Sequence, residues 1–268
     1  VDVSAASLGN LAEGFSSVIF GGATQSGTIT VAGVTTVADD LVLRAQLGSV
    51  VVGGSVSTVT STDAAGITIT GDGSGSTLAA NLTSRAGAIE IQDAALIDGA
   101  VTLDSTAADA VNAGPISFTG AIDGTNAPGG DTLTLDAAQG AVNGAGDAAV
   151  TLAGAAGTGV VAGAQDLEGL TISGAQVDVA NVVVDGGDIS ITGTNIDVNG
   201  SLYEATTSGS VSMNGAVDLD LDTGATVVMR TAGGLDTDDI VLGGLVSDAA
   251  AGTADGLELN ANGGGGAG

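Results

Sequence analysis

Apolar and polar residues alternate in short triplets along most of this chain, and each triplet stands just behind a glycine. Examples lie at 28–30, 67–69, 189–191 and 211–213. Alternation with a period of two is typical of β-strands that bury one face, whereas few windows show the spacing of an amphipathic helix. The segments between triplets are rich in Gly, Asn and Asp, which tolerate the positive φ of tight corners. The pattern therefore predicts an all-β chain of short strands from about Gly27 onward.

The glycines that precede the triplets indicate a repeat. Gly27, Gly48, Gly66 and Gly87 follow one another at a nearly constant spacing, and a second series between 169 and 209 has the same spacing. We therefore predict a parallel β-helix (β-solenoid) with about 20 residues per coil, a spacing typical of stacked repeats. Each strand would pair with its equivalents in the coils above and below, and Val, Ile and Leu would stack inside. About 13 coils at roughly 4.8 Å each would form a rod on the order of 60 Å long.

The repeat sets the expected domain organisation. Residues 1–26 are expected to form an amino-terminal cap or a segment of a preceding coil, and a short helix over 4–20 is the alternative. Residues 27–262 are expected to form a continuous solenoid, looser near 112–164, where both prolines lie, and 263–268 a Gly-rich tail. Because the chain begins without Met or a signal peptide, we expect a processed product or a segment of a longer protein.

Asn-Gly steps support a competing fold. Asn199-Gly200, Asn214-Gly215 and Asn143-Gly144 are hairpin signals, and hairpins would produce antiparallel sandwiches of an immunoglobulin-like kind. Sandwich strands are usually longer, and the expected core tryptophan is missing because the chain has no Trp. Asn-Gly steps serve equally well as solenoid corners, so the solenoid remains the preferred interpretation.

Composition and charge narrow the function classes. Aromatic residues make up 1% of the chain and glycine 47 of 268 residues, which suits narrow stacked layers better than a deep core. The formal charge of −28 disfavours binding to nucleic acid and to anionic membrane surfaces. No apolar run reaches the roughly 18 residues of a membrane span, so membrane insertion is not expected. The absence of cysteine fits an extracellular or cell-surface bacterial protein held together by backbone ladders.

The residue types also argue against an enzyme. Without His or Cys, no Ser–His or Cys–His nucleophile pair can form. Paired carboxylates would permit glycoside hydrolysis, but one Tyr and no Trp provide no aromatic platforms for sugars. The neighbours Tyr203 and Glu204 are better explained as residues of a solenoid corner. We therefore expect a non-enzymatic protein without an organic cofactor.

Two polar patterns are candidate ligand sites. Asp218, Asp220 and Asp222 alternate with leucines and so present three carboxylates on one strand face, where calcium could bind with help from Asp or Asn of a neighbouring coil. The alternative is a solvated acidic face. Thr-x-Thr triplets begin at 28, 68 and 132, and this spacing predicts no continuous ladder of hydroxyls of the kind that orders water against ice. Common Thr preference for strands explains them.

Four segments carry a family resemblance. The segments 114–122, 131–135, 170–175 and 187–193, the last reading Gly-Asp-Ile-Ser-Ile-Thr-Gly, resemble repeats of filamentous-haemagglutinin-like and other giant β-strand-repeat bacterial surface proteins. The resemblance covers most of the chain from about Gly27. It implies a right-handed parallel β-helix in a long secreted or surface-anchored protein, namely an adhesin, stalk, sheath or fibre subunit. The expected partners are further copies or flanking coils of the same protein, and the alternative is a loop-borne module that recognises a surface glycan or receptor.

Overall fold

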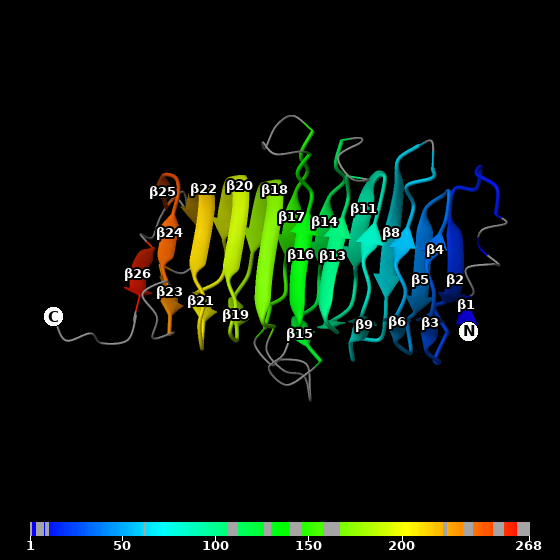
Figure 1. The fold of residues 1–268 in the computed structure, drawn as a ribbon, viewed down its shortest axis with the longest axis horizontal. Coiled ribbons are helices and arrows are strands. Elements are labelled where there is room, and N and C mark those ends of the chain that lie inside the picture. Colours follow the sequence, from blue (N-terminus) through cyan, green and yellow to red (C-terminus); the bar gives the residue numbers. More distant parts are fainter. Residues whose placement is uncertain are drawn as a thin grey trace.

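The computed structural model describes most of the chain as a stack of short strands. The described residues are 2–3, 8, 11–61, 63–106, 112–125, 130–139, 146–157, 167–221, 224–232, 238–248 and 255–261. Figure 1 shows the strands following one another along the long axis, from β1 at one end to β26 at the other. The strands form three faces, named here face one, face two and face three in the order in which each coil visits them.

Face one holds the sheet that begins with the first strand. Its strands, in order of pairing, are β1 (Asp2–Val3), β3 (Ile29–Val31), β6 (Val50–Val52), β9 (Ser76–Leu78), β12 (Ala95–Ile97) and β15 (Ile122–Gly124), followed by β19 (Val182–Val184), β21 (Leu202–Ala205), β23 (Thr226–Thr231) and β26 (Gly256–Ala261). Parallel bridges from Ala156 to Ile122 and to Val182 join the two parts. Face one is therefore continuous from β1 to β26.

Faces two and three share the long strands of the second half. Face two holds β4 (Thr35–Thr36), β7 (Val56–Ser57), β10 (Leu82–Thr83), β13 (Ala100–Asp104), β16 (Thr132–Asp136) and β24 (Ile240–Leu242). Face three holds β2 (Val18–Gly22), β5 (Leu41–Ala45), β8 (Ala65–Thr70), β11 (Ala86–Ile91), β14 (Ile116–Phe118), β17 (Val150–Leu152) and β25 (Val246–Ser247). The strands β18 (Gly169–Val179), β20 (Ile189–Val198) and β22 (Val211–Leu219) run through both faces.

Every pairing between these strands is parallel, which confirms the predicted all-β parallel solenoid. The hairpin alternative fails at both Asn-Gly steps that the structure describes. Gly215 lies within β22, where the strand passes from face two to face three, and Gly200 lies between β20 and β21. Both are corners. Asn143 and Gly144 lie outside the described residues.

The coils differ in length, unlike the uniform coil that the sequence pattern predicts. The register pairs Ser76 with Ala95 but Ile122 with Ala156, so the second of these coils is much the longer. Face one has eleven levels from β1 to β26, counting the Ala156 bridge. Ten steps of about 4.8 Å make a rod of roughly 48 Å. Where the structure describes such added residues, as at 58–61 and 71–75, they lie between strands of different faces, where added length costs little.

The core is a set of aliphatic columns rather than one irregular cluster. On face three, one inward position is occupied in successive coils by Leu41, Ile67, Ile89, Ile116, Val150, Val177, Ile196 and Val217, all at most 1% exposed. Each of these side chains packs on the same position of the coil above and below. The alternation of buried and partly exposed residues in these strands follows from the pleat, which points neighbouring side chains to opposite faces.

Several corners are closed by buried aspartates. Asp93 accepts hydrogen bonds from the backbone N–H groups of Gly73 and Ala94, at 2.8 and 2.9 Å, and from the Ser76 hydroxyl at 2.7 Å. Asp131 accepts from the Gly99 N–H at 2.7 Å. Corner N–H groups have no strand partner, and a carboxylate satisfies them with a charge-assisted bond. Part of the acidic composition is therefore structural.

The residues before Gly27 contribute to the amino-terminal end of the rod. At the amino-terminal end, β1 pairs with β3 and β2 with β5, so residues 2–3 and 18–22 already belong to the stack. Leu8 belongs to the hydrophobic core and is 2% exposed. Most of the remaining positions of the alternative helix over 4–20 lie outside the described residues or in irregular backbone. Within the described part of the chain, no helix has the length and hydropathy to cross a membrane.

Candidate functional site

The predicted calcium ligands lie at the carboxy-terminal part of face three. Asp218 is in β22 and points outward, whereas Leu219 and Leu221 are buried on the opposite side. Asp220 is exposed just beyond the strand, and Asp222 lies outside the described residues. The alternation of carboxylates and leucines is therefore as predicted for the part that is described.

A second grouping of carboxylates runs across coils rather than along one strand. Asp178, Asp197 and Asp218 occupy the same register position in β18, β20 and β22. We call these three residues the Asp ladder. Neighbouring strands lie about 4.8 Å apart, so like charges face each other with little separation. The sequence analysis missed Asp178 and Asp197, although their regular spacing, one coil from each rung to the next, is visible once a coil length is assumed.

Neutral donors compensate part of this repulsion. The Gln176 amide donates to Asp197 Oδ2 at 2.7 Å, and the Asn199 amide donates to Asp178 Oδ1. Burial raises the pKa of the Asp197 carboxyl above its ordinary value, and the charges of Asp178 and Asp218 raise it further. Among the described residues, no three Asp or Glu side chains are arranged to hold a metal ion. The calcium site thus stays a prediction.

Replacement of Asp197 by Asn is expected to stabilise the fold by about 0.5 kcal/mol at pH 7, because it removes a like-charge pair on each side. The raised pKa means that ionisation disfavours the folded state above that pKa. This gain in stability should shrink as the pH falls through the raised pKa of Asp197 in the folded state towards 3.8. Over that range the wild-type carboxyl becomes protonated and loses the charge that the substitution removes. Urea midpoints between pH 3 and pH 7 measure it.

Asp72 provides the control of opposite sign for this prediction. Hydrogen bonds from the Ser74 hydroxyl and N–H lower the pKa of the Asp72 carboxyl. Its ionised form therefore favours the folded state, and this contribution is lost as the pH falls through the lowered pKa. Asp72→Asn should decrease the urea midpoint at pH 7. A midpoint that moves in the same direction for both variants would contradict the assignment of Asp197.

Face two carries a column of hydroxyl groups that the sequence spacing did not predict. Five successive coils place a hydroxyl at one outward position: Thr102, Thr134, Thr171, Ser190 and Ser212. This column is a single row of hydroxyls and not a ladder of Thr-x-Thr triplets, so it does not contradict the expectation that no continuous ladder of such triplets forms. Loops of variable length bring these distant residues into register. The next outward column holds Ala100, Thr132, Gly169, Asp188 and Ser210, so no second row of threonines accompanies it. The column lacks the paired rows of a flat Thr-x-Thr array.

Tyr203 and Glu204 take part in contacts between coils. The Tyr203 ring is fully buried, and its hydroxyl donates to the Val179 carbonyl at 2.7 Å and accepts from the Gly200 N–H at 3.0 Å. Glu204 is paired in register with Arg230 of the next coil, and the two side chains form an ion pair at 2.7 Å. Both residues lie within β21 of face one, so the prediction that they form a corner is wrong; only the Tyr203 hydroxyl reaches the corner, through Gly200.

The carboxy-terminal end of the rod exposes a layer of core positions. In β26, Leu257 and Leu259 are in register with Val227 and Met229, which are fully buried in β23. The two leucines are nevertheless 37% and 51% exposed, because no described strand follows β26 on face one. The outer edge of β26 likewise has no strand partner among the described residues. This end, defined by β24, β25 and β26, is called the open end.

Comparisons with known proteins provide no further assignment. No family model, no curated protein and no solved structure matches the chain. The resemblance to filamentous-haemagglutinin-like proteins therefore stays a prediction, and function has to be argued from the geometry.

Proposed function

We propose that the chain is a structural, non-enzymatic solenoid segment of an extracellular bacterial fibre, stalk, sheath or giant adhesin, in which it acts as a stiff acidic spacer or a polymerising subunit. The observation that carries this proposal is the unbroken parallel pairing of face one from β1 to β26. Each coil is bonded to its neighbours by backbone ladders and by aliphatic columns. A rod of this kind transmits force along its axis without a hinge.

The acidic surface supports a spacer role. A net charge of −28 on a rod of roughly 48 Å corresponds to about one charge per 1.7 Å, the density of duplex DNA. Outward acids repel neighbouring rods of the same charge and so oppose lateral clumping. At the open end, the exposed Leu257 and Leu259 interrupt this acidic coat.

The open end supports the polymerising form. An unpaired parallel strand edge is a template for one more strand, and the exposed Leu257 and Leu259 would be buried by the next coil. A head-to-tail contact of this kind adds copies in one direction and builds a filament. The proposed partner that covers β26 is a further coil, supplied by a second copy of this chain stacked end to end or by flanking coils of the same long protein.

The test compares two substitutions of equal charge on neighbouring residues of β26. Leu259→Asp places a carboxylate in the exposed core position, whereas Asn260→Asp places it at the next position, which is outward. Sedimentation velocity of the full chain over a concentration series, with electron microscopy, is the measurement. We expect end-to-end oligomers for wild type and Asn260→Asp, and single rods for Leu259→Asp.

The spacer role and the polymerising role are contradicted by different results. Wild-type chains that remain single rods at every concentration would remove the polymerising subunit and leave the spacer. An experimental structure in which neighbouring strands run antiparallel would remove both. Equal loss of oligomers in the two variants would show that association depends on net charge rather than on the open end.

A further inference from the structure

Large exposed apolar side chains gather near the two ends of the rod, as far as the chain is described. Four of them precede residue 48, and four follow residue 240: Phe15, Ile19, Val34, Leu47, Val241, Leu245, Leu257 and Leu259. The described coils between these positions expose no large apolar side chain to the same extent. Single exposed apolar residues are ordinary on a protein surface, but a set confined to the two ends marks these ends as contact surfaces.

The amino-terminal end has an unpaired strand edge of its own. β2 pairs with β5 on one side, and no described strand pairs with its other side. The inward residues Val18 and Phe20 are in register with Leu41 and Leu43 of β5, which are at most 1% exposed. Leu8 packs against the core at this end, yet Val18 and Phe20 remain partly exposed. One further coil would bury them completely.

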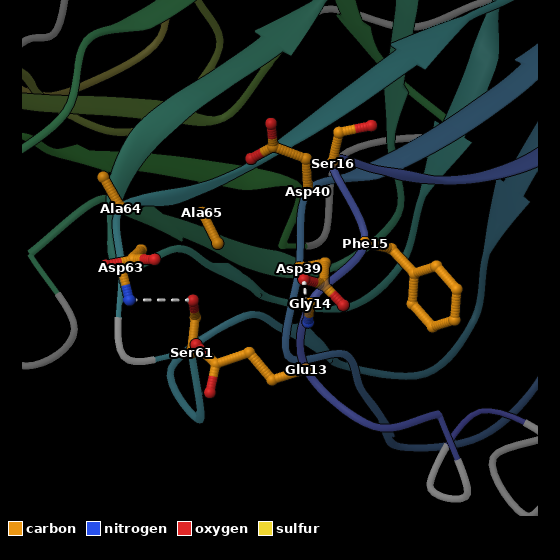
Figure 2. A pocket seen from close by; sticks show the side chains of 10 residues that line it. All are labelled: Glu13, Gly14, Phe15, Ser16, Asp39, Asp40, Ser61, Asp63, Ala64 and Ala65. Atoms are coloured by element: carbon orange, nitrogen blue, oxygen red, sulfur yellow. Dashed lines mark hydrogen bonds between the residues drawn. The ribbon is translucent and has the colours of Figure 1, made fainter.

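Two exposed side chains flank this edge. Ile19 is the outward residue between Val18 and Phe20 and is 53% exposed, and Phe15, just before the strand, is 57% exposed. Figure 2 shows the ring of Phe15 pointing away from Ser61 and Asp63, which lie across the hollow that all three residues line. The described part of the chain therefore leaves this ring open to a partner.

The two ends of the rod present matching faces. Face three begins with β2 and ends with β25, and face one begins with β1 and ends with β26. The first and last strands lie at opposite ends of the long axis (Figure 1). A copy placed head to tail on the open end therefore continues both faces with parallel strands. Two open ends placed against each other with aligned cores would pair their strands antiparallel, which no strand pair of the rod does.

The columns of the core set the register of a head-to-tail contact. Pairing in successive coils carries one inward column of face three from Val18 through Leu41 to Val246. Extended by one coil, this column places Val18 of the next copy opposite Val246, and Ile19 of the next copy opposite Ser247. Phe15 then reaches the corner that holds the exposed Leu245. The apolar groups of the two ends thus meet.

The charges on face three favour this arrangement over contact between two open ends. At the carboxy-terminal end, the Asp ladder finishes at Asp218, one coil before Ser247. At the amino-terminal end, the same outward column holds Ile19 and Val42, and the next outward position of β5 holds Arg44. Two open ends joined at face three would bring two Asp ladders together, and like charges on neighbouring strands are destabilising. A head-to-tail contact places uncharged residues and one cation there instead.

We propose that the amino-terminal end of a second copy is the surface that covers the open end, with its β2 on β25 and its β1 on β26. The inference rests on the proposed polymerising role and adds to it the partner surface, the direction and the register. Face two contributes no strand pairing, because no described strand lies between β1 and β2. The contact is heterologous, so successive copies form a filament with one polarity.

Cross-linking tests the register, because the chain has no cysteine of its own. The full chain with Ile19→Cys and Ser247→Cys carries one thiol at each end, on exposed outward residues. Residues in register on neighbouring strands lie about 4.8 Å apart, within the Cα separation that a disulfide spans. Mild oxidation and non-reducing gel electrophoresis are expected to show a ladder of covalent multimers, which a reducing agent returns to the single chain.

Two further variants provide the controls. The pair Ile19→Cys with Glu258→Cys also carries two exposed thiols, but Glu258 lies on face one, so cross-linking should be about tenfold slower or less. Ser247→Cys alone has no thiol at the amino-terminal end and should give no ladder. Equal rates for the two pairs, or rapid dimers of the single variant, would overturn the proposed register.

Blocking substitutions at the two ends provide a second test, which needs no thiol. Val18→Asp places a carboxylate in the amino-terminal surface, as Leu259→Asp does in the open end. Each variant alone should sediment as a single rod, whereas an equimolar mixture should form dimers, because each variant keeps one intact end. Dimers of Val18→Asp alone would mean that two open ends meet and would overturn the inference. Wild-type oligomers without the matched cross-link would overturn it as well and leave the polymerising role intact.

Discussion

Replacement of Tyr203 by Ala is expected to lower the free energy of unfolding by about 4 kcal/mol, the cost of removing a fully buried aromatic ring. Tyr203 has the largest fully buried side chain among the described residues. In its column it lies between Val182 of the coil before and Met229 of the coil after, so its loss leaves a hole across three levels. Urea unfolding followed by far-ultraviolet circular dichroism is the measurement, because the chain has no other Tyr and no Trp.

Replacement of Tyr203 by Phe separates packing from hydrogen bonding. Burial raises the pKa of the Tyr203 hydroxyl far above its ordinary value, so the group stays a donor to the Val179 carbonyl. Phe keeps the ring but leaves that carbonyl and the Gly200 N–H without this partner, at a cost of about 1–3 kcal/mol. If Phe cost as much as Ala, the ring would contribute nothing, and if Phe cost nothing, the hydroxyl would not stabilise the corner.

The strands could be predicted from the sequence because their signal is local. In triplets such as 189–191, one alternation of apolar and polar residues sets which side chains point inward, and the described strands follow it. The lack of Trp and the few aromatic residues correctly favoured stacked layers. Parallel pairing was then inferred from the short apolar triplets, although β18, β20 and β22 are long because each runs through two faces.

The register between coils could not be predicted, because it depends on loop lengths. Gly27 and Gly48 precede strands of face one, whereas Gly66 and Gly87 lie in strands of face three. The interval from Gly48 to Gly66 therefore runs from one face to another and does not measure a full coil. The mean spacing between these glycines was therefore shorter than the length of most coils. The hydroxyl column and the Asp ladder depend on this register and were missed for the same reason.

The incomplete hydrogen bonding of Asp39, whose Oδ1 accepts from the Gly14 N–H while its buried Oδ2 has no partner, could not be predicted for a different reason. The Asp39-Asp40 pair is typical of a corner, and it forms one, since Asp40 accepts a hydrogen bond from the Gly66 N–H at 2.6 Å. What sequence cannot tell is which corner aspartate has all of its oxygens bonded. That depends on where Gly14 and Ser61 lie, and both belong to irregular segments far from Asp39 in sequence.

Replacement of Gly209 by Ala is expected to destabilise the fold by about 3 kcal/mol or more, although only one methyl group is added. Gly209 has a φ of +104°, and a Cβ there would lie 2.1 Å from the carbonyl oxygen of Gly187 in the coil below. The left-handed backbone costs an L-residue about 1–2 kcal/mol, and forced overpacking adds about 1–3 kcal/mol. The Gly209 N–H also donates to Asp238 Oδ1 at 3.0 Å, a bond that a shift of the corner would stretch.

Gly186 is the matched control, because it isolates the close approach of two coils from the backbone conformation. Its φ is +99°, nearly that of Gly209, but a Cβ there would meet no atom within 4 Å. Gly186→Ala should therefore cost only the conformational part, about 1–2 kcal/mol, and shift the urea midpoint less than Gly209→Ala does. Equal midpoints for the two variants would mean that the coils are not held in contact at this corner. That result would contradict the tight stacking on which the stiffness of the rod depends.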